Sequence, residues 1–159
     1  MIYKIYSDSS IEPSNPGGIL TYGVIAKKGS DVLYKEAEII GWGTEATNNI
    51  GEATGVLVAM KWLLQQKEKL AAIIHSDSQL IVNQCTGEWR CNDAKLKPII
   101  ELIRKGKRKY GKTLHFKWIP RTENSEADEL SRTPYTEELI ETYKKHKLDI
   151  EFKGDDITF

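Results

Sequence analysis

The chain has 159 residues, in which 23 Lys and Arg balance 23 Asp and Glu, and 40% of the residues are hydrophobic. This length suits a single domain with a sizeable core, and the composition excludes disordered and collagen-like proteins and proteins that bind polyanions over their whole surface. With two cysteines, no signal peptide and no apolar run of bilayer length, we expect a cytoplasmic monomer that does not bind membranes.

The first third of the sequence predicts three β-strands joined by short turns. Runs rich in Ile, Tyr and Val cover residues 2–8, 20–27 and 32–40, and turn-forming residues cluster at 12–18 and 28–31. Short turns between such runs are typical of an antiparallel meander.

From residue 49 onward the hydrophobic period indicates helices that alternate with strands. Apolar residues at helical spacing predict a helix at about 49–66, and a short apolar run predicts a buried strand at 71–75. The remaining elements are a helix at about 78–86, a helical stripe at 96–103, a strand at 113–119, a helix at 124–131 and a polar tail that is helical over 136–145.

This order predicts an α/β protein with a mixed five-stranded sheet and helices on both faces. The three N-terminal strands form the meander, and the two later strands join it in parallel because their connections are long enough for crossovers. The sequence shows no second core, so we expect one domain over residues 1–134 and a polar C-terminal tail over 135–159.

Four acids stand out by their positions in these elements. Asp8 ends or interrupts the first strand, Glu52 lies near the start of the long helix, Asp77 follows the fourth strand and Asp128 lies near the start of the helix at 124–131. Functional groups of open α/β sheets gather at such strand and helix ends. Bare carboxylates about 4 Å apart repel by about 1–4 kcal/mol per pair, which favours a raised pKa or a bound cation. Oxygen ligands without His or Cys favour Mg²⁺ or Mn²⁺ over zinc.

Each acid taken alone also has a structural interpretation, as a turn or helix-capping residue. These assignments give Asp8 to a turn, Asp77 to the N-cap of the next helix, and Glu52 and Asp128 to capping boxes with Asn49 and Ser125, respectively. Taken singly, these interpretations are preferred. The shared placement of all four acids at element ends is what favours a site.

Several stretches agree in order and spacing with a known family. They are Tyr6–Ser10, Asn15–Gly18, Thr47–Asn49 with Glu52, Ser76–Gln79, Trp118–Arg121, and Asn124 with Ala127–Ser131. Over roughly residues 1–133, the chain resembles a type 1 ribonuclease H. The resemblance implies the three-layer RNase H-like fold and endonucleolytic cleavage of the RNA strand of RNA–DNA hybrids, which leaves 3′-hydroxyl and 5′-phosphate ends.

The resemblance also implies a catalytic metal site. Its ligands and catalytic residues are Asp8, Glu52, Asp77 and Asp128, and its cofactors are two Mg²⁺ ions, for which Mn²⁺ can substitute. In this scheme Asp8 bridges both ions, Glu52 and Asp77 share one, and Asp128 helps to hold the other.

Selectivity for RNA requires groups that read a 2′-hydroxyl, which both donates and accepts hydrogen bonds. By the resemblance, the substrate-binding residues are Asn48, Asn49 and Gln79, with backbone groups near Ser9 and Ser10, Thr47 at a DNA phosphate, and Asn124 beside the last acid. Helix capping is an equally good interpretation of the two adjacent asparagines, and one side chain can do both.

One departure from the family lies before the last acid. Many members carry a flexible loop there with a His, but only eight residues separate Ile119 from Asp128 and none is His. Arg121 and Glu123 are the candidates to replace it, and nothing in the sequence chooses between them.

Two other functions remain open at this stage. One is a different nuclease of the same fold, such as a junction resolvase or an integrase core, which the 2′-hydroxyl-reading residues disfavour. The other is a non-cleaving hybrid-binding module. The presence of all four acids disfavours it, because a cluster of negative charges facing the phosphates does not help a protein that only binds a nucleic acid.

The end of the chain offers a second resemblance. Asp155–Phe159 is similar to the acidic, Phe-ending tip of bacterial single-stranded DNA-binding proteins, with Thr158 where the tip usually has Pro. It implies contact with replication proteins through the terminal Phe and carboxylate. Packing of the same residues on the domain is the alternative.

Overall fold

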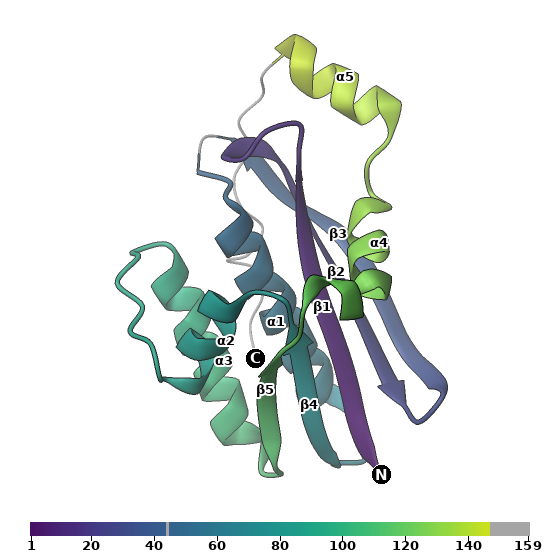
Figure 1. Cartoon of the computed structure of the whole chain (residues 1–159), viewed down its shortest axis with the longest axis vertical. Helices are drawn as coiled ribbons and strands as arrows, with labels where there is room; N and C mark the ends of the chain where they lie inside the picture. The colour runs from purple at the N-terminus through teal and green to yellow at the C-terminus, as the bar shows by residue number, and fades with distance from the viewer. Residues whose placement is uncertain (44, 147–159) are drawn as a thin grey trace.

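The computed structural model describes residues 1–43 and 45–146, which form a five-stranded sheet with helices (Figure 1). The strands are β1 (Ile2–Glu12), β2 (Gly17–Lys28), β3 (Asp31–Gly43), β4 (Ala71–Ser76) and β5 (Leu114–Trp118). The helices are α1 (Asn48–Gln65), α2 (Gln79–Thr86), α3 (Leu96–Tyr110), α4 (Ser125–Arg132) and α5 (Glu137–His146), and a 3₁₀ turn, η1, covers Arg121–Glu123. Every predicted element is present, and the meander strands extend beyond their predicted ends.

The sheet has the strand order β3-β2-β1-β4-β5, with β1 at its centre. The first three strands pair antiparallel, whereas β4 lies parallel to both β1 and β5. The predicted mixed sheet is therefore confirmed. The prediction that Asp8 ends or interrupts the first strand is wrong, because antiparallel pairing with β2 carries β1 on until Glu12 lies opposite Ile19.

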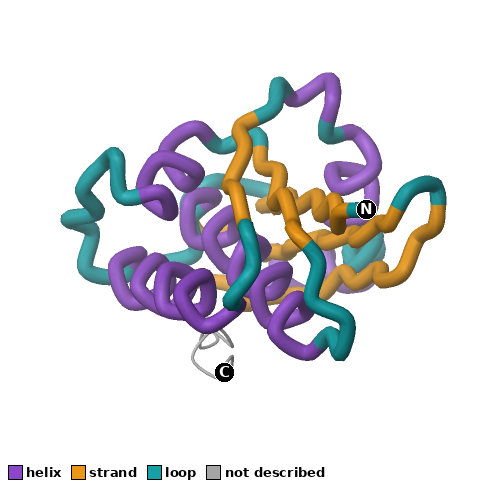
Figure 2. The backbone as a smooth tube through the Cα atoms, turned by 90° about the horizontal axis from the view of Figure 1, so that it is seen from below, coloured by secondary structure: helices purple, strands orange, loops and turns teal. Residues whose placement is uncertain are grey.

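Helices cover both faces of the sheet, as predicted. α1 packs on β1 and β2 from one side and also contacts α3, while α4 packs on β2 and β1 (Figures 1 and 2). Alternation along β2 shows that the two helices lie on opposite faces. Leu20 and Tyr22 point toward α1, whereas the Thr21 hydroxyl donates to the Ser131 carbonyl of α4 at 2.5 Å.

The long helix α1 forms the centre of the core. Its apolar residues at helical spacing, including Leu57 and Met60, are fully buried between the sheet and α3. Burying each such side chain stabilises the fold by about 1.5–3 kcal/mol. This apolar packing fixes the helix, and it also holds the acidic Glu52 of the same helix inside the protein, where it is 4% exposed.

Two glycines let the helices approach the sheet closely. A Cβ on Gly51 of α1 would lie 2.8 Å from the Ser9 Cβ of β1, and a Cβ on Gly23 of β2 would lie 2.6 Å from the Ser131 backbone nitrogen of α4. No side chain fits at either distance. Because Gly51 precedes Glu52 and Gly23 pairs with Asp8, both contacts lie beside acids singled out in the sequence.

The chain beyond residue 134 begins attached to the sheet. The Tyr135 hydroxyl donates to the Ile19 carbonyl of β2 at 2.8 Å, and α5 follows. The division into a domain over 1–134 and a tail stays a prediction, and the Asp155–Phe159 tip lies outside the described residues. Within the described part of the chain, no helix combines the length and apolar character needed to cross a membrane.

Candidate active site

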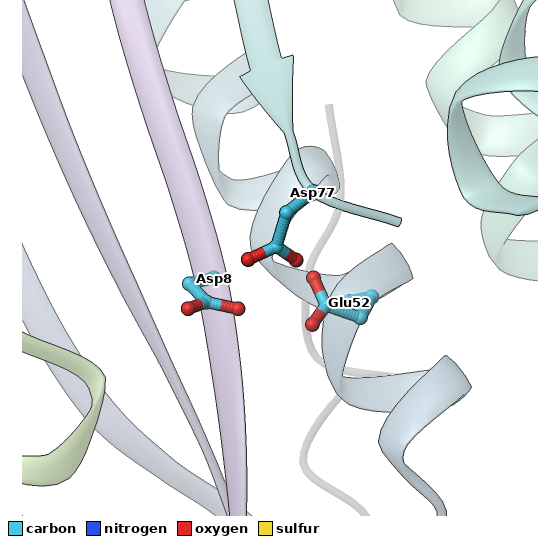
Figure 3. A group of neighbouring side chains, drawn as sticks. All are labelled: Asp8, Glu52 and Asp77. Carbon is cyan, nitrogen blue, oxygen red and sulfur yellow. The ribbon is translucent and has the colours of Figure 1, made fainter. Parts of the chain in front are cut away.

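Three of the four acids meet beyond the point where β1 and β4 stop pairing. The last parallel pair joins Tyr6 and His75, after which β1 continues with Asp8 and β4 ends before Asp77. Glu52 enters from α1. One carboxylate oxygen from each of the three acids lies within 4.8 Å of the others (Figure 3).

The fourth acid, Asp128, lies on α4 at the margin of this group. It is half-buried, and its carboxylate lies 3.4 Å from the Arg132 Nε atom. Its negative charge contributes to the raised pKa values of Asp8 and Asp77, so the four acids interact electrostatically. The grouping of three acids within 4.8 Å does not include it.

Burial and mutual repulsion disfavour the ionised forms of the three central acids. Burial, followed by the charge of Asp77, raises the pKa of Asp8 to about 7, although the Ser9 backbone N–H donates to its Oδ1 at 2.8 Å. Burial and then the charge of Asp8 raise the pKa of Glu52 well above its ordinary value. Burial also raises the pKa of Asp77.

The arrangement of oxygens fits divalent cations. Glu52 Oε2 and Asp77 Oδ2 are buried and have no hydrogen-bond partner among the described residues. A buried, unpartnered carboxylate oxygen is costly unless it binds a cation or a proton. A set of carboxylates without His or Cys is the donor set that Mg²⁺ and Mn²⁺ prefer.

The structure contradicts the helix-capping interpretations of the acids. The side chain that caps α1 is that of Thr47, which accepts from the Ile50 N–H, and the side chain that caps α2 is that of Ser78, which accepts from the Ile81 N–H. Asn124 occupies the N-cap position of α4. Capping therefore explains neither Asp77 nor the proposed pairs of Glu52 with Asn49 and of Asp128 with Ser125.

Most of the predicted substrate-binding residues lie at the start of α1 or α2, next to the acids. Asn49 and Gln79 are exposed and Asn48 is half-buried, and the Asn48 side-chain oxygen accepts from the Ser9 hydroxyl at 3.0 Å. Thr47 is half-buried as the α1 cap, and Ser9 and Ser10 are each 7% exposed. The helix N-termini therefore present the asparagines and Gln79 beside the acid cluster.

Asn124 is placed differently, because it is 1% exposed. Its side-chain N–H donates to the Ser7 carbonyl of β1 at 2.9 Å, and its interaction with Asp77 lowers the pKa of that acid against the effect of burial. The Asp128 backbone N–H donates to the Asn124 carbonyl at 3.0 Å. In this structure Asn124 links the segments that carry the acids.

A cavity of about 400 Å³ opens beside the acids. Glu52 and Asp77 line it together with Trp118, the last residue of β5, and with Pro120 and Arg121, which follow that strand. The tryptophan and the proline are site residues that the sequence motifs did not predict. Their position in the sequence could have indicated this, because the ends of neighbouring parallel strands lie at one edge of the sheet. The strands at β4 and β5 were both predicted.

The family follows from comparison with known proteins. A family model described as reverse transcriptase-like matches residues 18–133, which is most of the chain. The chain belongs to this family. Its curated relatives include the bifunctional protein Rv2228c of Mycobacterium tuberculosis and an uncharacterized protein of Mycobacterium bovis, each 28% identical over 102 residues. The match covers 64% of this chain but spans only 27% of the length of these relatives.

Solved structures connect this reverse transcriptase-like chain to type 1 ribonuclease H. LC11-RNase H1, isolated from compost, is 30% identical with a TM-score of 0.72, and the match covers 80% of this chain and 91% of that one. The N-terminal RNase H domain of Rv2228c from M. tuberculosis is 23% identical with a TM-score of 0.74, covers 92% and 99% of the two chains, and shows the shared fold. The resemblance to type 1 ribonuclease H and the predicted RNase H fold are confirmed.

Proposed function

We propose that this chain hydrolyses the RNA strand of RNA–DNA hybrids and leaves 3′-hydroxyl and 5′-phosphate ends. The observation that carries the proposal is the meeting of Asp8, Glu52 and Asp77 on a type 1 ribonuclease H fold. The structure of LC11-RNase H1 has also been solved in complex with an RNA/DNA hybrid, and the protein in that complex is 29% identical to this chain. This supports a hybrid as the substrate.

The acids are assigned to hold two Mg²⁺ ions, for which Mn²⁺ can substitute. Bound ions of this kind supply Lewis-acid activation of water and stabilise the charge that develops on the leaving 3′-oxygen. Asp8 would contribute to holding both ions, Glu52 and Asp77 would hold one of them with it, and Asp128 would help to hold the other. The water oxygen bonds to phosphorus and releases its proton to solvent, while the bond to the 3′-oxygen breaks and that oxygen takes a proton from solvent, so no protein nucleophile is needed.

The helix N-termini are assigned to substrate recognition. The Asn48 side-chain oxygen is occupied by the Ser9 hydroxyl, which leaves its N–H₂ group to donate to a 2′-hydroxyl. Asn49 and Gln79 are exposed for the same purpose, together with backbone groups near Ser9 and Ser10, and Thr47 holds a phosphate of the DNA strand. Asn124 supports the site from within.

The protein acts as a cytoplasmic monomer, and the Asp155–Phe159 tip contacts replication proteins.

The test of this function is a cleavage assay on uniformly labelled RNA–DNA hybrid, duplex RNA and duplex DNA, with Mg²⁺, Mn²⁺ or a chelator. We expect only the RNA of the hybrid to be cut, with no activity in chelator. Asp8→Asn removes a ligand charge while keeping the shape, so its activity falls below detection, whereas the exposed control Asp31→Asn keeps the activity of the natural protein.

Each alternative function has its own outcome in this assay. Cutting of duplex DNA in place of the hybrid shows a junction resolvase or integrase-like nuclease. No cleavage in any metal, with the labelled hybrid retained by the protein in a parallel binding measurement, shows a non-cleaving binding module. Either result contradicts the proposed function.

A further inference from the structure

One face of the sheet carries a group of basic side chains. Residues that pair across neighbouring strands point to the same side of a sheet. Lys4 of β1 pairs with Lys27 of β2 and with Ile73 of β4, and Ile73 in turn pairs with His115 of β5. Lys4 and His115 are exposed, and Lys27 is half-buried. This is the side of the sheet on which α4 packs, since Lys27 pairs with Glu126 of that helix at 2.6 Å.

The next row places a third lysine beside two stacked rings. Tyr6 pairs with His75, and His75 pairs with Lys117. The Tyr6 and His75 rings stack with 4.3 Å between their centroids, and the His75 Nδ1–H donates to the Ile5 carbonyl at 2.9 Å. Burial lowers the pKa of His75 against the effect of this hydrogen bond, and the charges of Lys117 and Lys4 lower it further. Both ammonium groups therefore lie close to a neutral ring.

These residues form a surface, the basic sheet face, that leads to the acids and consists of Lys4, Lys27, His115 and Lys117. Asp8 points to the same side of β1 as Lys4 and follows it by four residues, which is about 13 Å along the strand. β4 runs parallel to β1 and ends directly before Asp77 (Figure 1). A polyanion bound at the acids can therefore continue onto the basic sheet face within the length of a few nucleotides.

The charges of this face are available to a ligand. Lys4 and Lys117 are exposed and form none of the ion pairs found among the described residues, whereas Lys27 pairs with Glu126. Lys4 also stands directly opposite Lys27, and like charges in such a cross-strand pair repel each other. A bound anion relieves this repulsion, so the face is suited to an anionic partner.

We propose that the basic sheet face is a second nucleic-acid-binding site, which holds the phosphates of an unpaired RNA strand that continues from the hybrid beyond the cleaved bond. This inference rests on the proposed function and adds a substrate class to it, namely a hybrid with a single-stranded extension. Lysine side chains bind backbone phosphates without regard to sequence, which suits an extension of any composition.

The position of the face favours a single strand over a duplex. α1, whose N-terminus is assigned to the hybrid, packs on the other side of the sheet from α4 and the basic sheet face. A double helix is stiff, with a persistence length of about 150 base pairs for DNA, so the hybrid cannot bend round the strand ends from one side of the sheet to the other. An unpaired strand is flexible enough to do so.

The experiment measures the binding of labelled probes by fluorescence anisotropy. The probes are a blunt RNA–DNA hybrid and the same hybrid with an unpaired RNA extension at its 5′ or its 3′ end. All proteins carry Asp8→Asn, so that the probes stay intact in Mg²⁺. Lys4→Gln with Lys117→Gln is compared with the control Lys105→Gln with Lys109→Gln, which removes the same charge from two exposed lysines of α3.

We expect one of the two extensions to raise the affinity of the Asp8→Asn protein for the hybrid. Two lysine–phosphate contacts on a single strand contribute a salt slope of about 1.4, so this gain shrinks by about 7-fold between about 50 and 200 mM salt. Lys4→Gln with Lys117→Gln removes the gain and its salt dependence, whereas the control variant keeps both. In the otherwise natural chain, the same two substitutions leave the cleavage rate of the blunt hybrid unchanged, because neither lysine belongs to the acid site.

Several results overturn the inference. Neither extension raising the affinity shows that no unpaired strand is bound, and a gain that survives Lys4→Gln with Lys117→Gln shows that it is bound elsewhere. An equal loss in the control variant shows a response to net charge alone. Displacement of the extension by a polyglutamate peptide but not by single-stranded RNA shows that the face binds an acidic protein segment instead.

The proposed function fails separately from this inference. If the natural protein cuts the blunt hybrid, each of the results above leaves the proposed function intact. A natural protein that cuts no hybrid overturns the proposed function and this inference with it.

Discussion

At the scale of single residues, the site brings the carboxyl groups of three acids close together inside the protein. Asp8 and Glu52 are 3% and 4% exposed, and their carboxylates face each other and Asp77 (Figure 3). Burial, followed by repulsion from neighbouring acids, raises the pKa values of all three acids, so without cations the site favours bound protons. The clustering and burial of these acids favour cation binding, and the same clustering and burial destabilise the metal-free protein.

The raised pKa of Asp8 predicts how the stability of the metal-free protein depends on pH. The pKa is about 7 in the folded state against an ordinary 3.8, so the folded state binds more protons between those values. The free energy of unfolding therefore falls as the pH rises from about 4 to about 7. Asp8→Asn removes this loss, and at pH 8 in chelator its Tm exceeds that of the natural protein by about 2 °C or more.

Thermal denaturation of both proteins across pH 4–8 measures this effect. Asp31→Asn is the control, because that acid is exposed at the start of β3. Equal Tm values for Asp8→Asn and the natural protein at pH 8 would contradict the raised pKa.

Asn124→Ala tests whether the buried amide positions the acids. The variant leaves the Ser7 carbonyl without its donor, so we expect a loss of about 1–3 kcal/mol in the free energy of unfolding. Mg²⁺ affinity also falls, because Asp77 and Asp128 lose their link to β1. Thr122→Ala, an exposed neighbour, is the control in chemical denaturation and calorimetry. If Asn124→Ala kept full stability and only raised the KM for the hybrid, the result would instead indicate that Asn124 contacts the substrate directly.

At the scale of elements, glycines at the contact points determine how closely the helices approach the sheet. Gly51 and Gly55 lie one turn apart on α1, but only Gly51 is tightly enclosed. A Cβ on Gly55 would lie 3.4 Å from the Ser7 Cβ, which is an ordinary contact, whereas one on Gly51 would overlap both Ser9 and Leu20. The distance between α1 and β1, and so between Glu52 and Asp8, depends on Gly51.

Alanine at these two positions therefore has opposite effects. Gly51→Ala pushes α1 away from β1 and lowers the free energy of unfolding by about 1–3 kcal/mol, with a loss of Mg²⁺ affinity as Glu52 moves. Gly55→Ala keeps the packing and gains up to about 1 kcal/mol from helix propensity. Urea denaturation and Mg²⁺ calorimetry on the two variants measure both effects. Equal behaviour of the pair would show that the close approach at Gly51 does not matter.

The same elements show how far sequence reasoning reached. Apolar residues at helical spacing located α1, and runs rich in Ile, Tyr and Val located the strands, because these are the residues that the core buries. Cap identity was missed at Asp77, because Ser78 is an equally good cap one residue later. The buried state of Asn124 and the tight contact at Gly51 were missed because both depend on segments distant in sequence. An isolated glycine inside a helical pattern was the one local sign of the second.

At the scale of the whole molecule, cation binding and folding stability are linked. Only the folded chain brings the acids together, so bound Mg²⁺ stabilises it, by about 2.7 kcal/mol at a free concentration 100 times the Kd. We expect this rise in Tm to be larger at pH 8 than at pH 5, because ligands must lose their protons to bind a cation. Thermal shifts with Mg²⁺ and with chelator at both pH values measure it, and Asp8→Asn is the control with little response. A Mg²⁺ effect independent of pH would contradict the linkage.

The central position of β1 has a consequence for protein synthesis. Asp8 precedes its partners after β4 and on α4 by some 70 and 120 residues. A growing chain can form the β1–β2–β3 meander early, but it cannot complete the acidic site until α4 has emerged and docked on Gly23. A fragment that ends before α4 therefore carries Asp8, Glu52 and Asp77 without the helix and the fourth acid that complete the site.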